Sequence, residues 1–220
     1  MSIIKVTLFQ KNINQDITRD QKVKLISQKS DFVIFPEYFP YTAQWNEKSP
    51  TDNSSIYVDR LLEISEYYKG TIIGGSIIRE ENGKLYHSCP IIKDVALIDW
   101  YDIKSVEAQK DRTSVNLTEG QGEGIYILNG VRFGITLGAD ILREEFLQFY
   151  QKEGVEVVFN PLATPLLNNT AEKKQYDKDL EHYAALSKEY ALNLVRVCAI
   201  GDAFGSSYSG RSLYCGESGI

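Results

Sequence analysis

The chain has 220 residues, with 24 Lys and Arg against 30 Asp and Glu, so its formal net charge is −6. This length favours one domain over residues 1–220. The acidic balance, with no run of basic residues, argues against a nucleic-acid partner. No apolar stretch approaches the ~18 residues of a membrane span, and the first residues lack an export signal. We therefore expect a cytoplasmic protein that binds neither nucleic acid nor membrane.

Cysteine and histidine are scarce in this sequence. Three Cys (Cys89, Cys198 and Cys215) form an odd number without paired spacing, which fits a reducing compartment better than a disulfide framework. The two His, His87 and His182, cannot supply any known zinc ligand spacing. The sequence therefore predicts chemistry without a metal.

The first half of the chain mixes crossover units with antiparallel hairpins. Thr18 is a typical N-cap residue for a helix, and Asn82-Gly83 is a preferred hairpin dipeptide. A short apolar run before Pro36 indicates a strand covered on both faces. The predicted elements are strand 3–9, helix 18–28, strand 31–35, helix 56–68, and strands 71–78, 84–92 and 95–101.

The second half repeats the same mixture. Asn129-Gly130 predicts another hairpin, and Gly154 marks the end of a helix. The predicted elements are strands 125–128 and 131–137, helix 141–152, strand 155–159, helix 172–191, and strands 193–198 and 211–215. This order indicates an α/β fold with mixed sheets whose faces are covered by helices.

Three short segments carry side chains or backbone groups suited to chemistry. Glu37 follows a buried strand, at the end where open α/β sheets place ligands, and apolar surroundings would raise its pKa toward that of a general base. Lys104 follows the strand ending at Tyr101 and offers a positive charge to an oxyanion. Gly138-Ala139-Asp140 turns a strand into a helix and aims backbone N–H groups at whatever lies above. Each has an ordinary alternative: an exposed carboxylate, a solvated Lys, or a plain connection.

Taken together, these segments resemble the nitrilase or carbon-nitrogen hydrolase superfamily. Phe35-Pro36-Glu37 resembles its Glu motif, 101–104 its Lys motif, and 134–140 the run that the family writes Gly-x-x-x-Cys-x-Asp. Asn160-Pro161 and Gly210-Arg211-Ser212 also match in order and strand context. The resemblance covers nearly the whole chain.

The resemblance implies an αββα sandwich in which Glu, Lys and Cys meet in one pocket and hydrolyse non-peptide C–N bonds of a small amide or nitrile without a cofactor. Carried over, Glu37 is the base, Lys104 stabilises the oxyanion, and the amide of Ala139 is the backbone donor. A second acid often follows the Lys in amidase members, and here both Glu107 and Asp111 fit. The family also implies a homodimer or larger homo-oligomer.

The sequence departs from the family pattern at the nucleophile. Position 138 is Gly, so the chain has no thiol there and is expected to be inactive or strongly impaired. The Lys motif usually reads Tyr-x-Lys but here has one more residue, so Lys110 stays open as an alternative to Lys104. The chain also stops short of the family's usual final strands. Two hypotheses remain: a hydrolase whose nucleophile was lost by mutation, natural or engineered, or a non-catalytic scaffold that binds a small metabolite or a protein partner.

Overall fold

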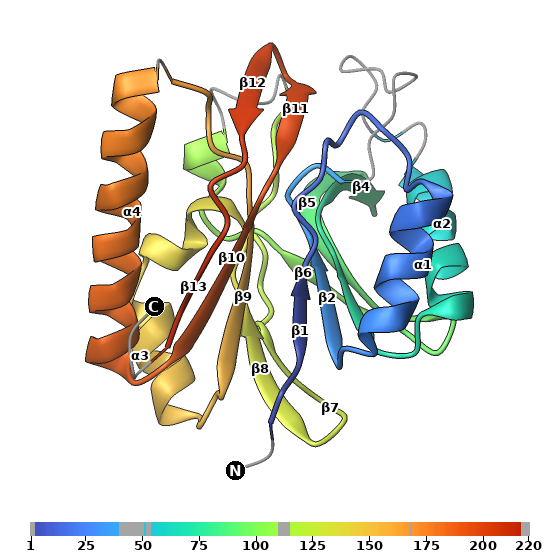
Figure 1. Ribbon diagram of the computed structural model, residues 1–220, viewed down its shortest axis with the longest axis horizontal. Coiled ribbons are helices and arrows are strands. Elements are labelled where there is room, and N and C mark those ends of the chain that lie inside the picture. The colour runs from blue at the N-terminus through green and yellow to red at the C-terminus, as the bar shows by residue number, and fades with distance from the viewer. Residues whose placement is uncertain (1–2, 40–50, 52–53, 110–114, 168, 217–220) are drawn as a thin grey trace.

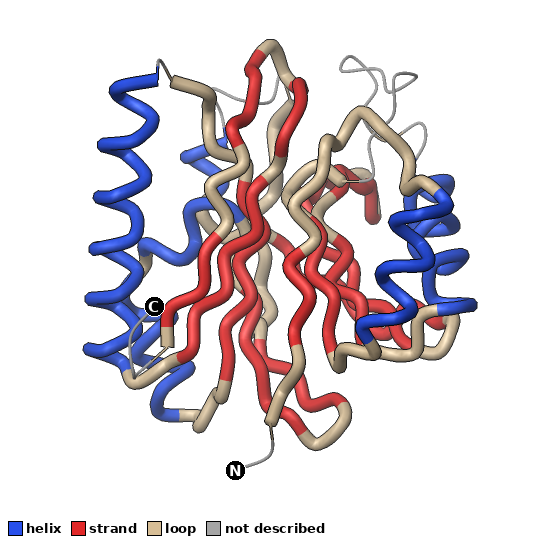
Figure 2. Tube along the Cα trace, viewed as in Figure 1, coloured by secondary structure: helices blue, strands red, loops and turns tan. Residues whose placement is uncertain are grey.

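Two β-sheets pack face to face, and helices cover the outer face of each sheet (Figure 1). The computed structural model describes residues 3–39, 51, 54–109, 115–167 and 169–216. Figure 2 shows the strands of both sheets at the centre and the helices outside them. This arrangement confirms the predicted αββα sandwich.

The first sheet comes from the first half of the chain. Its strand order is β1-β2-β3-β5-β4, and β6 pairs with β5. β1, β2 and β3 are parallel, and the other pairs are antiparallel. The strands are β1 (Val6–Leu8), β2 (Phe32–Phe35), β3 (Thr71–Gly74), β4 (Ile77–Glu81), β5 (Lys84–Lys93) and β6 (Ala96–Asp102).

The second sheet has the order β13-β10-β9-β8-β7, and its three central strands are parallel. Its strands are β7 (Ile125–Leu128), β8 (Val131–Ile135), β9 (Val157–Leu162), β10 (Asn193–Cys198) and β13 (Leu213–Cys215). A separate hairpin of β11 (Ile200–Ala203) and β12 (Ser206–Ser209) follows β10.

The helices lie where the apolar patterns place them. α1 (Arg19–Gln28) and α2 (Ser54–Tyr67) cover the first sheet, and α3 (Glu144–Lys152) and α4 (Asn169–Tyr190) cover the second (Figure 1). Thr18 caps α1 by accepting a hydrogen bond from the Gln21 N–H, as its sequence predicts. Two 3₁₀ helices, η1 (Val106–Gln109) and η2 (Gly138–Leu142), follow β6 and β8.

Three apolar clusters fill the three spaces between the layers. The middle cluster joins the two sheets, and the rings of Phe32, Phe133 and Phe159 meet there with centroids 5.1–5.5 Å apart. Burial of each such side chain contributes about 2–3 kcal/mol. The outer clusters join each sheet to its helices.

The single strand predicted over 71–78 is wrong, because the chain turns at Gly75-Ser76 between β3 and β4. Gly75 has a φ of +72°, and a Cβ there would lie 2.3 Å from the Pro36 carbonyl oxygen. Only glycine allows this close approach to the segment that carries Glu37. The turn therefore brings Ser76 to that segment.

Other boundaries also differ from the predicted ones. The strand predicted over 131–137 ends at Ile135, and α3 begins at Glu144 after the 3₁₀ turn η2. The hairpin of β11 and β12 was not predicted, because its tip is a polar, Gly-containing run without apolar alternation. These differences shift the ends of elements but leave the layers unchanged.

Candidate functional site

Glu37 lies two residues beyond the end of β2 and is completely buried. Its Oε2 accepts a hydrogen bond of 2.6 Å from the backbone N–H of Ala163, just beyond the end of β9. A backbone N–H bonded to a carboxylate is a strong, charge-assisted contact. The carboxylate is thus held at the interface between the first and second sheets.

His87, for which the sequence motifs predict no role, faces the same carboxylate. Its Nδ1 lies 3.8 Å from Glu37 Oε1, and its Nε2 lies 2.7 Å from Ser76 Oγ. The Tyr38 ring stacks on the imidazole with a centroid distance of 5.3 Å. A His within the predicted strand 84–92 was the available signal, but its partners are distant in sequence.

The turn after β8 carries Gly138, Ala139 and Asp140. Gly138 has a φ of +55°, in the left-handed region where side chains cost free energy. The Asn160 Nδ2 of β9 donates to the carbonyl oxygens of Thr136 (3.1 Å) and Gly138 (3.2 Å). β9 therefore holds this turn through Asn160. Ala163, the residue that follows β9, holds the Glu37 carboxylate.

Asp140 joins the same turn to the end of β6. Its buried carboxylate accepts hydrogen bonds from the Tyr101 hydroxyl (2.7 Å), the Lys104 N–H (3.1 Å) and the Ser105 N–H (2.6 Å). Three donors on one carboxylate fix the backbone of the predicted Lys motif against η2. The family motif includes Asp140, but the sequence alone does not indicate these contacts.

The Lys104 side chain extends toward α3. Its Nζ lies 4.6 Å from the centre of the Phe146 ring. Burial lowers the pKa of the Lys104 ammonium; the Asp140 carboxylate acts in the opposite direction, and Arg143 lowers it further. Among the described residues, Phe146, Asp140 and Arg143 act on the Lys104 side chain. None of these three is among the contacts given above for Glu37.

The two candidates for a second acid lie beyond Lys104. Glu107 is exposed in η1. Asp111 lies outside the described residues. The choice between them stays a prediction.

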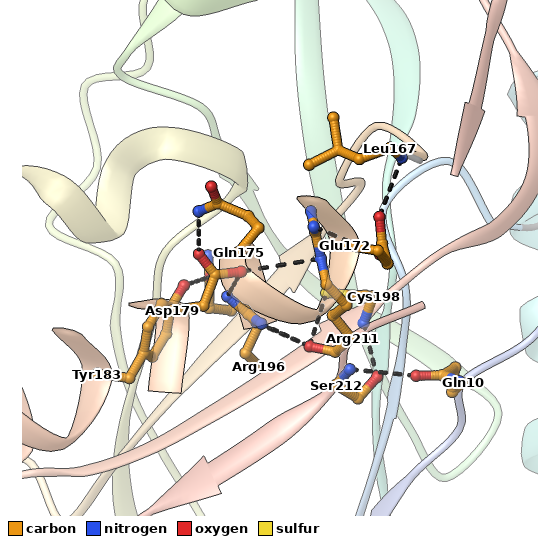
Figure 3. A network of polar contacts seen from close by, with 11 residues as sticks. Gln10, Leu167, Glu172, Gln175, Asp179, Tyr183, Arg196, Cys198, Arg211 and Ser212 are labelled. Atoms are coloured by element: carbon orange, nitrogen blue, oxygen red, sulfur yellow. Dashed lines mark hydrogen bonds and ion pairs between the residues drawn. The ribbon is translucent and has the colours of Figure 1, made fainter. Parts of the chain in front are cut away.

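Gly138 and Ala139 line a pocket of about 330 Å³ beside α4. Asp179, Arg196 and Arg211 line it and belong to the network in Figure 3. In that network Arg196 Nη1 lies 3.0 Å from Asp179 Oδ2, and Arg211 Nη1 lies 3.4 Å from Glu172 Oε1. Two guanidinium groups thus face two carboxylates, so their formal charges cancel. Among the described residues that line this pocket, Glu37 and Lys104 do not occur.

No group of three or more His, Cys, Asp or Glu within the described ranges is placed to hold a metal ion. In the same part of the chain, no helix is long and apolar enough to cross a membrane.

Relatives of this chain among known proteins include omega-amidases and a nitrilase homolog. The omega-amidase NIT2 of Xenopus tropicalis is 27% identical over 155 residues, which are 64% of this chain and 55% of that protein. The chain spans about half the length of the curated relatives it matches. No family model matches it.

Solved structures share the fold over nearly the whole chain. A carbon-nitrogen hydrolase from Helicobacter pylori G27 superposes with a TM-score of 0.77 at 16% identity, covering 97% of this chain and 82% of that one. Saccharomyces cerevisiae Nit3, a member of branch 10 of the nitrilase superfamily, gives 0.71 at 17% identity, covering 98% and 83%. The chain thus has a carbon-nitrogen hydrolase fold and sequence relatives among omega-amidases, which confirms the predicted resemblance to the nitrilase superfamily.

Proposed function

We propose that the chain is a carbon-nitrogen hydrolase domain for small amides or nitriles in which the nucleophile position, 138, is occupied by Gly. One observation carries the proposal. The buried Glu37 carboxylate and the turn at Gly138 are both fixed by β9 and the residue that follows it. A buried carboxylate beside a strand-to-helix turn is an arrangement in which a base can act on a group carried by that turn.

The chemistry requires a thiol at position 138. Glu37 takes the thiol proton as the sulfur attacks the carbonyl carbon of the amide, and the oxyanion forms beside the Ala139 N–H. The C–N bond then breaks, the amine leaves with the proton from Glu37, and a thioester remains. Water that Glu37 deprotonates hydrolyses this thioester and restores the thiol.

Lys104 has the proposed role of stabilising the oxyanion. Its ammonium rests over the Phe146 ring, so this role requires the side chain to swing from α3 toward the turn. The flexible four-carbon stem of Lys permits such a movement while Asp140 keeps the Lys104 backbone in place.

Without a nucleophile, the chain as written is expected to turn over amides very slowly. Loss of an activated nucleophile costs on the order of 10⁶ in turnover in an enzyme of this general type. The three Cys of the chain do not replace it, because all three are buried and burial raises the pKa of each thiol.

Gly138→Cys tests the proposal, with Gly138→Ala as its matched control. Both variants place a side chain at a φ of +55° and so share a backbone cost of about 1–2 kcal/mol, but only one supplies a thiol. We expect ammonia release from a panel of small aliphatic amides with Gly138→Cys and none with Gly138→Ala or the unaltered chain.

The proposal fails if Gly138→Cys folds as stably as Gly138→Ala and yet neither releases ammonia nor gains mass with any amide. Calorimetry on the unaltered chain then decides what remains. Binding of the same amides without reaction would identify a binding scaffold in place of a hydrolase.

A further inference from the structure

Glu37 lies in a buried cage made by segments that are distant in sequence. Tyr38 follows β2, Ser76 lies in the turn between β3 and β4, and His87 comes from β5; all three are completely buried. A carboxylate and an imidazole this deep in a protein are costly to hold unless their polar atoms face partners. The contacts among these residues therefore indicate what His87 does.

Ser76 determines how the imidazole of His87 is held. The Tyr38 N–H donates to Ser76 Oγ at 2.9 Å, so this oxygen already accepts one hydrogen bond. His87 Nε2 lies 2.7 Å from the same oxygen, and the Ser76 hydroxyl can donate its proton to this nitrogen while it accepts from Tyr38. With Nε2 as the acceptor, the neutral ring carries its proton on Nδ1.

The Nδ1 edge of His87 faces Glu37. Nδ1 lies 3.8 Å from Glu37 Oε1, while Oε2 of the same carboxylate is bonded to the Ala163 N–H. The Tyr38 ring is nearly parallel to the imidazole, at an interplanar angle of 7°, which fixes the ring plane. Oε2 is thus hydrogen-bonded to the backbone, whereas Oε1 faces the imidazole at a distance longer than a hydrogen bond.

The backbone around this cage is strained. Tyr38 has a φ of +65°, a region that non-glycine residues avoid at a cost of about 1–3 kcal/mol. The Tyr38 N–H is also the group that bonds Ser76. The fold therefore maintains an unfavourable backbone conformation at the residue that both stacks on His87 and orients it through Ser76.

We propose that His87 is a positioning residue for Glu37, and that its Nδ1–H, which faces the Glu37 carboxylate while Nε2 contacts Ser76, keeps that carboxylate correctly aimed. The pairing of His87 with Glu37 is independent of the proposed hydrolase function. Its catalytic consequence rests on that function, since Glu37 must act as the base.

Nuclear magnetic resonance of the unaltered chain tests the pairing directly. The chain has only two His, so ¹⁵N spectra of the imidazole nitrogens are simple, and His182→Gln assigns the remaining ring to His87. We expect the Nδ1–H tautomer for His87 and a marked shift of its Nδ1 resonance in Glu37→Gln. An Nε2–H tautomer, or an Nδ1 resonance that Glu37→Gln leaves unchanged, would overturn the proposal.

Ser76→Ala gives a second test should Glu37→Gln fail to fold. It removes the partner of Nε2 and leaves Glu37 in place. If the carboxylate attracts the Nδ1 proton, that tautomer persists in Ser76→Ala. A switch to the Nε2–H tautomer would show that Ser76 alone determined the ring, and the proposal would be wrong.

Two substitutions in the Gly138→Cys background test the catalytic consequence. The amide nitrogen of Asn reaches the position of His Nδ1, and that of Gln reaches the position of Nε2. His87→Asn should therefore keep kcat within about tenfold, whereas His87→Gln should lower kcat about 100-fold with little change in KM, the cost expected for a misaligned catalytic group.

Equal losses in the two variants would mean that His87 only fills space. If Gly138→Cys itself shows no turnover, the proposed function fails, but the tautomer experiments still decide whether His87 pairs with Glu37. The two failures are therefore distinguishable.

Discussion

Burial sets the chemistry of single side chains in this protein, and Cys198 shows the effect. Its thiol is fully buried at the end of β10, with Sγ 3.4 Å from the Arg211 carbonyl oxygen. Burial raises the pKa of this thiol to about 11, although the Arg196 guanidinium acts in the opposite direction. The thiol is therefore protonated at neutral pH and is a poor nucleophile.

This pKa makes the stability of the fold depend on pH. Between pH 9 and 11 the unfolded thiol ionises while the folded thiol stays protonated, so the free energy of unfolding falls as pH rises through this window. Two pKa units correspond to about 3 kcal/mol. Urea unfolding at pH 8 and pH 11 should show the unaltered chain losing about that much more stability than Cys198→Ala. An equal loss in both proteins would contradict the assigned pKa.

Connections between elements depend on a few buried polar side chains, of which Asp140 is the clearest case. It bonds the end of β6 to η2 through one hydroxyl and two backbone N–H groups. The sequence motif predicted the position of Asp140, and the strand patterns predicted β6 and β8. The bonds themselves could not be predicted, because they join residues that only the folded sheets bring together.

Asp140→Asn should destabilise the fold by about 3 kcal/mol. The amide has one acceptor oxygen, and its NH₂ group would face a backbone donor, which leaves buried N–H groups without a partner. Urea denaturation measures the change, with the exposed Asp177→Asn in α4 as the control, expected to stay within about 0.5 kcal/mol. A loss in Asp140→Asn no larger than that of the control would show that these bonds do not support the turn.

Local sequence patterns cannot show contacts between distant segments, and this explains which site residues the sequence indicated and which it did not. Glu37 and the turn at Gly138 stand out locally, because each follows an apolar strand. His87 and Ser76 do not, since their partners depend on the turn at Gly75 that the strand prediction missed. The 2.7 Å contact between Ser76 Oγ and His87 Nε2 forms because the chain turns between β3 and β4, where one continuous strand had been predicted.

At the scale of the whole molecule, the space between the two sheets supports both the fold and the site. Phe159 of β9 is completely buried against Phe32 and Phe133. The next residue, Asn160, holds the turn at Gly138. The apolar strand patterns predicted such a core, but the pairing of one sheet with the other follows from the family resemblance and not from periodicity.

Phe159→Ala should remove this packing at a cost of about 3–5 kcal/mol. For a chain of this size, that loss lowers Tm by roughly 10 °C. Thermal unfolding measures it, and Ile127→Ala, at a residue 60% exposed in β7, is the control. A change in Tm as small as in the control would mean that the two sheets do not depend on this contact.

Association into a homodimer, a cytoplasmic location and the absence of a nucleic-acid partner stay predictions. Sedimentation equilibrium of the unaltered chain tests the first of them, and a mass near the 24.9 kDa of one chain would contradict it.

The central claim is that position 138 is an empty nucleophile site served by Glu37, and intact mass spectrometry tests it most directly. After incubation with a small amide, Gly138→Cys should gain the mass of one acyl group. The double variant Gly138→Cys, Glu37→Gln should gain it far more slowly, because its thiol has no base. If both variants acquire the acyl group at the same rate, or if both are folded and neither acquires it nor releases ammonia, Glu37 does not serve position 138 and the account is wrong.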